Sequence, residues 1–121
     1  MSHHVLIADD EPNIVISLEY LLKKEGFQVT VATDGEAAIR MAGELKPQLV
    51  LLDIMMPKKS GFEVCESLRA NPELAGLKII MLTAKGRETE VTKGLALGAN
   101  AYVTKPFSTK ELVTQIKSLL A

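Results

Sequence analysis

The sequence predicts an α/β fold, a doubly wound five-stranded parallel sheet with helices on both faces. Three observations lead to this fold class. Short runs of β-branched and aliphatic residues alternate with longer amphipathic segments along the chain. One short run, QLVLLD at 48–53, is almost entirely apolar, which is typical of a central strand buried on both faces. Right-handed crossovers between parallel strands place the intervening helices on both sides of the sheet.

The first part of the chain is predicted to form a strand, a helix and a second strand. His4–Ala8 (HVLIA) is the first strand. Pro12 suits the first helical position, where its missing N–H would have no partner, and Gly26 ends this helix. The segment 27–32 (FQVTVA) is the second strand.

A second helix leads into the central strand. Thr33 and Glu36 have the spacing of a capping box, in which each side chain accepts a hydrogen bond from the other residue's backbone N–H. Pro47 closes the helix. The strand at 48–53 then ends in a carboxylate, Asp53.

The third and fourth helices flank the fourth strand. Ser60 and Glu63 repeat the capping-box spacing ahead of the third helix, and 78–82 (KIIML) is the fourth strand. The segment 87–97 is a weaker helix, because Gly94 inside it costs on the order of 1 kcal/mol relative to Ala.

A short fifth strand at 101–103 and a last helix, capped by Ser108 and Glu111, complete the pattern. Helical spacing predicts which apolar side chains face the core. In chain order they are Ile14, Leu18, Leu21, Leu22, Ala38, Ile39, Ala42, Leu45, Phe62, Cys65, Leu68, Val91, Leu95, Leu112, Val113, Ile116, Leu119 and Leu120.

Composition indicates one globular domain spanning 1–121. The net charge of −1 argues against a nucleic-acid or anionic-membrane surface, and we find neither a signal peptide nor an apolar run that could span a bilayer. The lone Cys65 is interpreted as a core residue, and His3 and His4 as surface residues rather than a metal site. These features favour the cytosol.

Polar residues stand at four predicted strand ends. They are Asp9, Asp10, Asp53, Thr83 and Lys105. Taken singly, such residues are solvated turns, surface charges or helix caps. Parallel strands bring their carboxyl ends to one edge of the sheet, so we expect the five to form one site. Three converging carboxylates repel one another, and a hard divalent cation such as Mg²⁺ relieves that repulsion. A carboxylate in this setting can accept a phosphoryl group as an acyl phosphate.

The sequence resembles the receiver domains of bacterial two-component response regulators over nearly its whole length. The matching segments are VLIADDEPNI, ATDGEAAI, LVLLDIMMPKKSGFEV, IIMLTA and LGANAYVTKPFSTKEL. The resemblance implies a flavodoxin-like fold with strand order 2-1-3-4-5. It implies a signalling switch that catalyses only its own phosphorylation and dephosphorylation.

The resemblance also implies roles for individual residues. Asp53 would accept phosphate from a histidine kinase or a histidine phosphotransfer protein. Asp10, Asp53 and the backbone carbonyl of Met55 would hold Mg²⁺, with Asp9 reaching the ion through water.

The remaining implied roles concern the bound phosphoryl group and the switch. Lys105, the Thr83 hydroxyl and the Ala84 N–H would bind phosphoryl oxygens. The Lys105–Pro106 bond would be cis. Thr83 and Tyr102 would form the switch that reports phosphorylation to an output domain or protein, through the fourth helix, the fifth strand and the fifth helix.

Two departures from family patterns suggest properties of this chain. Met55 and Lys85 stand where the resemblance places control of water access, which predicts slow self-dephosphorylation. One large subfamily dimerises through charged residues whose matching positions here hold Val91, Asn100, Ala101, Glu111 and Gln115. Only the glutamate is charged, so we expect no charge-paired symmetric dimer of that kind and a face suited to a hydrophobic or heterologous contact.

Three other functional classes fit the sequence less well. A flavin-binding module would need a phosphate-cradling loop after the first strand, where this chain has the acidic DDEP. A phosphatase of the haloacid dehalogenase type would need an acid at Met55. A scaffold domain has no need for clustered acids and Lys105.

Overall fold

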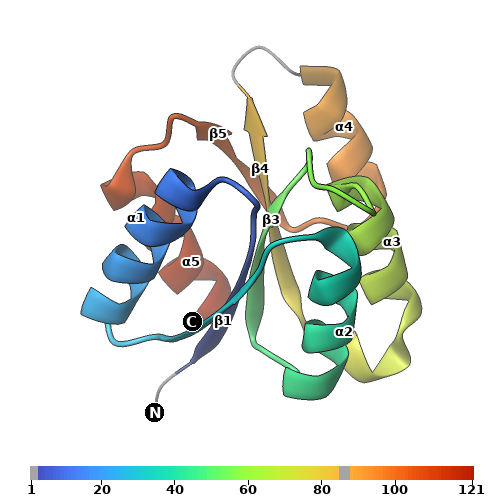
Figure 1. The fold of residues 1–121 in the computed structure, drawn as a ribbon, viewed down its shortest axis with the longest axis horizontal. Helices are drawn as coiled ribbons and strands as arrows, with labels where there is room; N and C mark the ends of the chain where they lie inside the picture. Colours follow the sequence, from blue (N-terminus) through green and yellow to red (C-terminus); the bar gives the residue numbers. More distant parts are fainter. Residues whose placement is uncertain (1–2, 85–87) are drawn as a thin grey trace.

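The computed structural model describes residues 3–84 and 88–121 (Figure 1). Within these residues the strands are β1 (His4–Ala8), β2 (Gln28–Ala32), β3 (Leu49–Asp53), β4 (Lys78–Ala84) and β5 (Ala101–Lys105). The helices are α1 (Pro12–Lys24), α2 (Gly35–Leu45), α3 (Gly61–Ala70), α4 (Glu88–Ala96) and α5 (Thr109–Leu120), with a 3-10 turn at Pro72–Leu74. The predicted alternation of strand and helix is confirmed.

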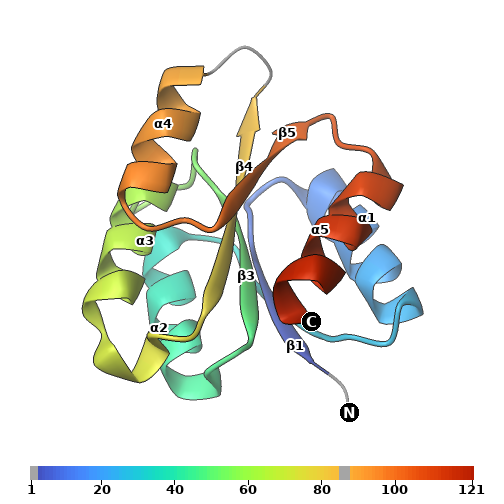
Figure 2. The ribbon, with the colours of Figure 1, turned by 180° about the vertical axis from the view of Figure 1, so that it is seen from behind.

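The strands form one parallel sheet in the order β2-β1-β3-β4-β5, as predicted. Helices α1 and α5 cover one face, and α2, α3 and α4 cover the other (Figures 1 and 2). Strand β3 is central, and every residue in it is buried, which confirms the interpretation of the apolar run. The doubly wound fold class is therefore correct.

Each face of the sheet has its own apolar core. Leu6, Val50 and Leu52 pack toward α2 and α3, whereas Ile7 and Leu51, one residue out of phase, pack toward α1 and α5. This alternation follows from the two-residue period of a strand. Full burial of each large side chain contributes about 1.5–3 kcal/mol to folding. The two cores together hold the carboxyl ends of the strands in register.

The cap of α2 differs from the prediction. The N-cap is Asp34, whose Oδ1 accepts the Ala37 N–H at 2.8 Å, and Thr33 is an exposed residue before it. The prediction of a Thr33–Glu36 capping box is therefore wrong, because the helix begins one residue later than that box requires. The Ser60–Glu63 box is complete.

Two leucines predicted to face the core are exposed. Leu45, the last residue of α2, is 42% exposed, and Leu95 on α4 is 43% exposed. Gly94 is the buried residue of α4, and a Cβ there would lie 3.2 Å from Met81 Cγ. The helix packs so closely on β4 that Gly94 faces the sheet. Leu95, about 100° further around the helix, then faces away. The glycine that weakens the helix locally is thus needed for packing.

Candidate functional site

The five predicted residues meet at the carboxyl edge of the sheet. Asp53 is the last residue of β3, Thr83 is the second-last residue of β4, and Lys105 is the last residue of β5. Both β4 and β5 extend two residues further than predicted. Asp9 directly follows β1, with its N–H donating to Ala32 O at 3.1 Å. Parallel pairing places Ala84 beside Lys105. The sheet therefore assembles one site from segments far apart in sequence.

Lys105 is the cationic centre of the site. Its Nζ lies 3.0 Å from Asp9 Oδ2, 3.3 Å from Asp53 Oδ1 and 3.0 Å from Glu11 Oε1. Burial by itself would lower the pKa of Lys105, but hydrogen bonds to Asp9 and Glu11 and the charge of Asp53 outweigh it and raise the pKa. The ammonium is therefore a permanent positive charge. The Lys105–Pro106 peptide bond is cis, as predicted.

Glu11 is a site residue that the sequence reasoning missed. Its N–H donates to Asp9 Oδ1 at 2.9 Å, and its carboxylate contacts Lys105. In the sequence it is one more acid in the run DDE, directly before Pro12. Only the position of β5 relative to the β1–α1 connection shows that this acid reaches the lysine.

Three carboxylates gather beside Lys105. Asp9, Asp10 and Asp53 each offer an oxygen within 4.8 Å of the others. Asp9 is 0% exposed and Asp53 5%, whereas Asp10 is exposed. Burial, then the charge of Asp9, raises the pKa of Asp53 to about 6, with Lys105 opposing the rise. The free energy of bringing these charges together is the reason a cation would bind here.

The loop after β3 holds the Asp53 carboxylate in place. Its Oδ1 accepts the Met55 N–H at 3.4 Å, and the Gly61 N–H donates to Ile54 O at 2.8 Å. A Cβ on Gly61 would lie 2.4 Å from Asp53 O. Glycine is therefore required for α3 to begin against the acceptor strand. Met55 itself is 73% exposed, beside the site rather than in the core.

Thr83 lines a small cavity with Asp53 and Lys105. The cavity has a volume of about 120 Å³, and Ala84 and Glu90 also border it. Thr83 is 2% exposed, so its hydroxyl is directed by protein contacts rather than by bulk water. The cavity provides a place beside Asp53 where a small anion would meet the hydroxyl and the ammonium. Lys85, predicted to control water access, lies outside the described residues.

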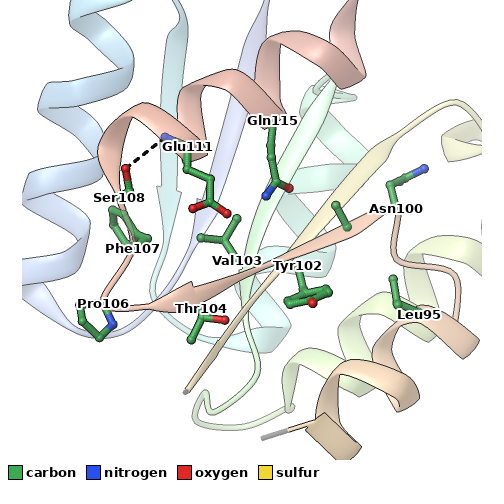
Figure 3. Close-up of a pocket in the computed structure, with 11 residues that line it drawn as sticks. Leu95, Asn100, Tyr102, Val103, Thr104, Pro106, Phe107, Ser108, Glu111 and Gln115 are labelled. Carbon is green, nitrogen blue, oxygen red and sulfur yellow. Dashed lines mark hydrogen bonds between the residues drawn. The ribbon is translucent and has the colours of Figure 1, made fainter. Parts of the chain in front are cut away.

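The predicted switch aromatic lies on a second, larger concave surface. Tyr102 is 43% exposed and borders a pocket of about 550 Å³ between β5, α4 and α5. Figure 3 shows Leu95 from α4 and Gln115 from α5 on either side of the strand that carries Tyr102. Asn100 and Glu111 also line this pocket. Three residues that depart from the charge pattern, Asn100, Ala101 and Gln115, thus gather on one face with Glu111, whereas Val91 does not line the pocket.

The other residues singled out by sequence lie away from the site. Cys65 is buried in the core between the sheet and α3, as predicted, and burial raises the pKa of its thiol. His4 contacts Thr30 Oγ1 at 2.7 Å through Nε2, and the His3 ring packs 6.4 Å from that of Phe27. No helix in the described ranges is long and apolar enough to cross a membrane.

Comparison with known proteins agrees with this geometry. The family described as response regulator receiver domain matches residues 5–117. A protein from Chloroflexus aurantiacus J-10-fl, assigned as a response regulator, is 34% identical, with 99% of this chain and 98% of that chain covered and a TM-score of 0.96. The chemotaxis response regulator CheY4 of Vibrio cholerae is 27% identical, with coverage of 98% and 99% and a TM-score of 0.92.

A third structure shows a metal in the corresponding type of cleft. It is the receiver domain of a sensor histidine kinase from Pseudomonas aeruginosa PAO1, 28% identical over 98% of each chain with a TM-score of 0.91, and it has a magnesium ion coordinated in the active-site cleft. The family match over most of the chain, together with the shared strand order, shows that this protein belongs to the response regulator receiver domains of two-component phosphorelay signalling.

Proposed function

We propose that this receiver accepts a phosphoryl group on Asp53 in a magnesium-dependent reaction. The observation that carries the proposal is the place of the Asp53 carboxylate. It borders a cavity shared with the Thr83 hydroxyl and lies 3.3 Å from the Lys105 ammonium. A carboxylate so placed has a nucleophilic oxygen, a cation and a hydrogen-bond donor around one small volume.

The chemistry follows from these groups. An Asp53 oxygen forms a bond to phosphorus while the phosphorus–nitrogen bond to a donor histidine breaks, and the electron pair of that bond returns to the imidazole. Lys105 neutralises charge on one phosphoryl oxygen, and Thr83 donates a hydrogen bond to another, together with the Ala84 N–H. Hydrolysis by water later restores the carboxylate and releases inorganic phosphate. The protein acts on itself and is a switch rather than an enzyme with an external substrate.

The carboxylate cluster fits magnesium. Three carboxylates are hard oxygen ligands, and the exposed Asp10 forms no hydrogen bond or ion pair with the part of the chain that the structure describes. Both oxygens of Asp9 have protein partners, which agrees with a role through water. Asp10, Asp53 and the Met55 carbonyl would hold the ion directly. Bound there, magnesium supplies positive charge to the phosphoryl oxygens.

The donor would be a histidine kinase or a histidine phosphotransfer protein, and the output would be read from the α4–β5–α5 face. The support for the second point is the exposed pair Leu95 and Tyr102 around the pocket of about 550 Å³. Exposed apolar side chains set among polar ones on a concave surface are typical of a binding face. The uncharged Asn100 and Gln115 on this face agree with a heterologous partner.

The direct test is labelling with acetyl phosphate. We expect the intact mass to rise by one phosphoryl group in the presence of Mg²⁺ and to stay unchanged in EDTA. Hydroxylamine should remove the label, because it cleaves acyl phosphates and leaves phosphate esters of Ser or Thr intact. A label that resists hydroxylamine, or none at all with Mg²⁺ present, would contradict the proposal.

Magnesium should also stabilise the fold. Binding to the native state alone adds RT ln(1 + [L]/Kd), about 2.7 kcal/mol at 100-fold over Kd. We expect the melting temperature to rise with Mg²⁺ in the parent protein and to respond little in Asp10→Asn. Asp34→Asn is a suitable control, because Asp34 caps α2 and is not one of the three clustered carboxylates. Equal responses of the parent and the Asp10 variant would remove Asp10 from the metal site.

A further inference from the structure

A carboxylate from α4 borders the same cavity as the acceptor. Glu90 lies in the first turn of α4 and lines the cavity together with Asp53, Thr83 and Lys105. Its Oε1 is 3.4 Å from Thr83 Oγ1, and Ala84 O is an alternative acceptor at the same distance. Thr83 is almost fully buried, so these acceptors determine where its hydroxyl hydrogen points. Sequence reasoning had not singled out Glu90, because it reads as an ordinary first-turn acid.

The contact between Glu90 and Thr83 is incompatible with a phosphoryl group that uses the same hydroxyl. A threonine hydroxyl has one hydrogen and donates one hydrogen bond at a time. A phosphoryl group on Asp53 would carry about −1.5 to −2 charges in place of the single carboxylate charge, in a cavity bordered by the Glu90 carboxylate. Lys105 already faces Asp9, Glu11 and Asp53. Negative charge added to this cavity therefore shares Lys105 with three carboxylates and is repelled by the Glu90 carboxylate.

Helix α4 is lightly held against the rest of the fold. Its buried residue is Gly94, which has no side chain to bury, and Leu95 is exposed. Lys93 adds a contact of 4.5 Å between its Nζ and the centre of the Phe62 ring. Elements with little buried apolar surface are the ones that shift at low free-energy cost. The free energy of one polar contact at the start of α4 is therefore large relative to the packing free energy that holds this helix on the sheet.

We propose that Glu90 is a positioning residue that holds the Thr83 hydroxyl away from the acceptor and disfavours entry of a dianionic phosphoryl group. When Asp53 is phosphorylated, the hydroxyl passes from Glu90 to a phosphoryl oxygen, and repulsion between that group and the Glu90 carboxylate moves the first turn of α4 outward. The same residue thus slows phosphorylation and couples it to the α4–β5–α5 face. This inference rests on the proposed phosphorylation of Asp53.

The test compares Glu90→Gln with Glu88→Gln. Both remove one negative charge from the first turn of α4, but Glu88 is exposed and does not border the cavity. In Mg²⁺ and low salt, Glu90→Gln should take up phosphate from acetyl phosphate about two- to five-fold faster than the parent, the range typical of one charge interaction near a surface. The advantage should shrink in 1 M salt, where the screening length falls to about 3 Å. Glu88→Gln should take up phosphate at about the rate of the parent.

Hydrogen exchange of α4 amides provides a second readout. Glu90→Ala removes the acceptor, so exchange in the first turn of α4 should be faster before phosphorylation and should change less on phosphorylation than in the parent. Equal labelling rates for Glu90→Gln and Glu88→Gln, or a rate difference that does not depend on salt, would overturn the role of Glu90. If the parent itself is not labelled, the proposed function fails instead, so the two failures are distinguishable.

Discussion

Replacing Asp53 with Asn is expected to abolish phosphorylation and, in the absence of magnesium, to stabilise the fold. The amide has no anionic oxygen to attack phosphorus, so no mass increase should follow incubation with acetyl phosphate and Mg²⁺. A label that persists in Asp53→Asn at the parent rate would show that another side chain is the acceptor. Asp34→Asn is the matched control and should be labelled normally.

The gain in stability follows from the surroundings of Asp53. Burial, then the charge of Asp9, raises its pKa from 3.8 to about 6 in the folded protein. Between these two pKa values the folded state binds a proton that the unfolded state releases, so the free energy of unfolding falls as the pH rises through this window. Above about pH 6 the ionised carboxylate destabilises the folded state by the full amount, whereas Asn carries no charge. Each pKa unit is worth about 1.4 kcal/mol, and the net shift already includes the opposing attraction of Lys105, so we expect a gain of about 3 kcal/mol.

Urea unfolding in EDTA measures this gain. The advantage of Asp53→Asn should be greatest at about pH 7.5 and should shrink as the pH falls from about 6 toward 3.8, below which the parent carboxyl is protonated in both states. Added Mg²⁺ should narrow the difference, because it stabilises the parent more than the variant. If the variant is less stable than the parent in EDTA at neutral pH, the buried carboxylate is not a source of strain.

Replacing Gly61 with Ala should strongly destabilise the protein and disorganise the acceptor site. The added Cβ would lie 2.4 Å from Asp53 O and 2.7 Å from Ile54 Cα, both backbone atoms that cannot rotate away. Relieving the overlap requires α3 to move away from the end of β3. Overpacking of this kind typically costs about 1–3 kcal/mol. The rate of phosphorylation at a temperature where the variant is folded should fall as well, because the Met55 N–H and the Asp53 carboxylate belong to the displaced loop.

Gly43→Ala is the matched control. Gly43 lies within α2, and a Cβ there would meet no atom within 4 Å. Alanine is favoured over glycine inside a helix by about 1 kcal/mol. We therefore expect urea unfolding to give a lower free energy of unfolding for Gly61→Ala and a higher one for Gly43→Ala. Equal, small effects of the two substitutions would show that α3 does not approach the acceptor loop as closely as the structure places it.

Sequence patterns predicted the elements well where a local interaction decides them. Pro12 starts α1, the Ser60–Glu63 box starts α3, and the apolar run ending in Asp53 is the central strand. The errors lie where two local choices compete. Thr33 and Asp34 are both good N-cap residues, and spacing to Glu36 favoured the wrong one.

The errors in predicting which side chains face the core have a different origin. Leu45 and Leu95 follow helical spacing but are exposed, because spacing gives the relative angles of side chains and not the direction of the neighbouring sheet. Gly94, which has no side chain, is the residue of α4 that faces β4. The close approach of α4 to Met81 decides this, and no pattern within the helix reveals it.

By itself the sequence determined the fold class and the five residues at the strand ends, because both follow from local periodicity and from the rule that parallel strands share one carboxyl edge. Only the tertiary structure decided which of these groups touch. The bond between Lys105 and Glu11 joins β5 to the connection after β1, and the contact between Thr83 and Glu90 joins β4 to α4. Such contacts depend on distances between segments that no sequence spacing sets. They are short-range interactions, so a shift of about 1 Å in one helix would make or break them.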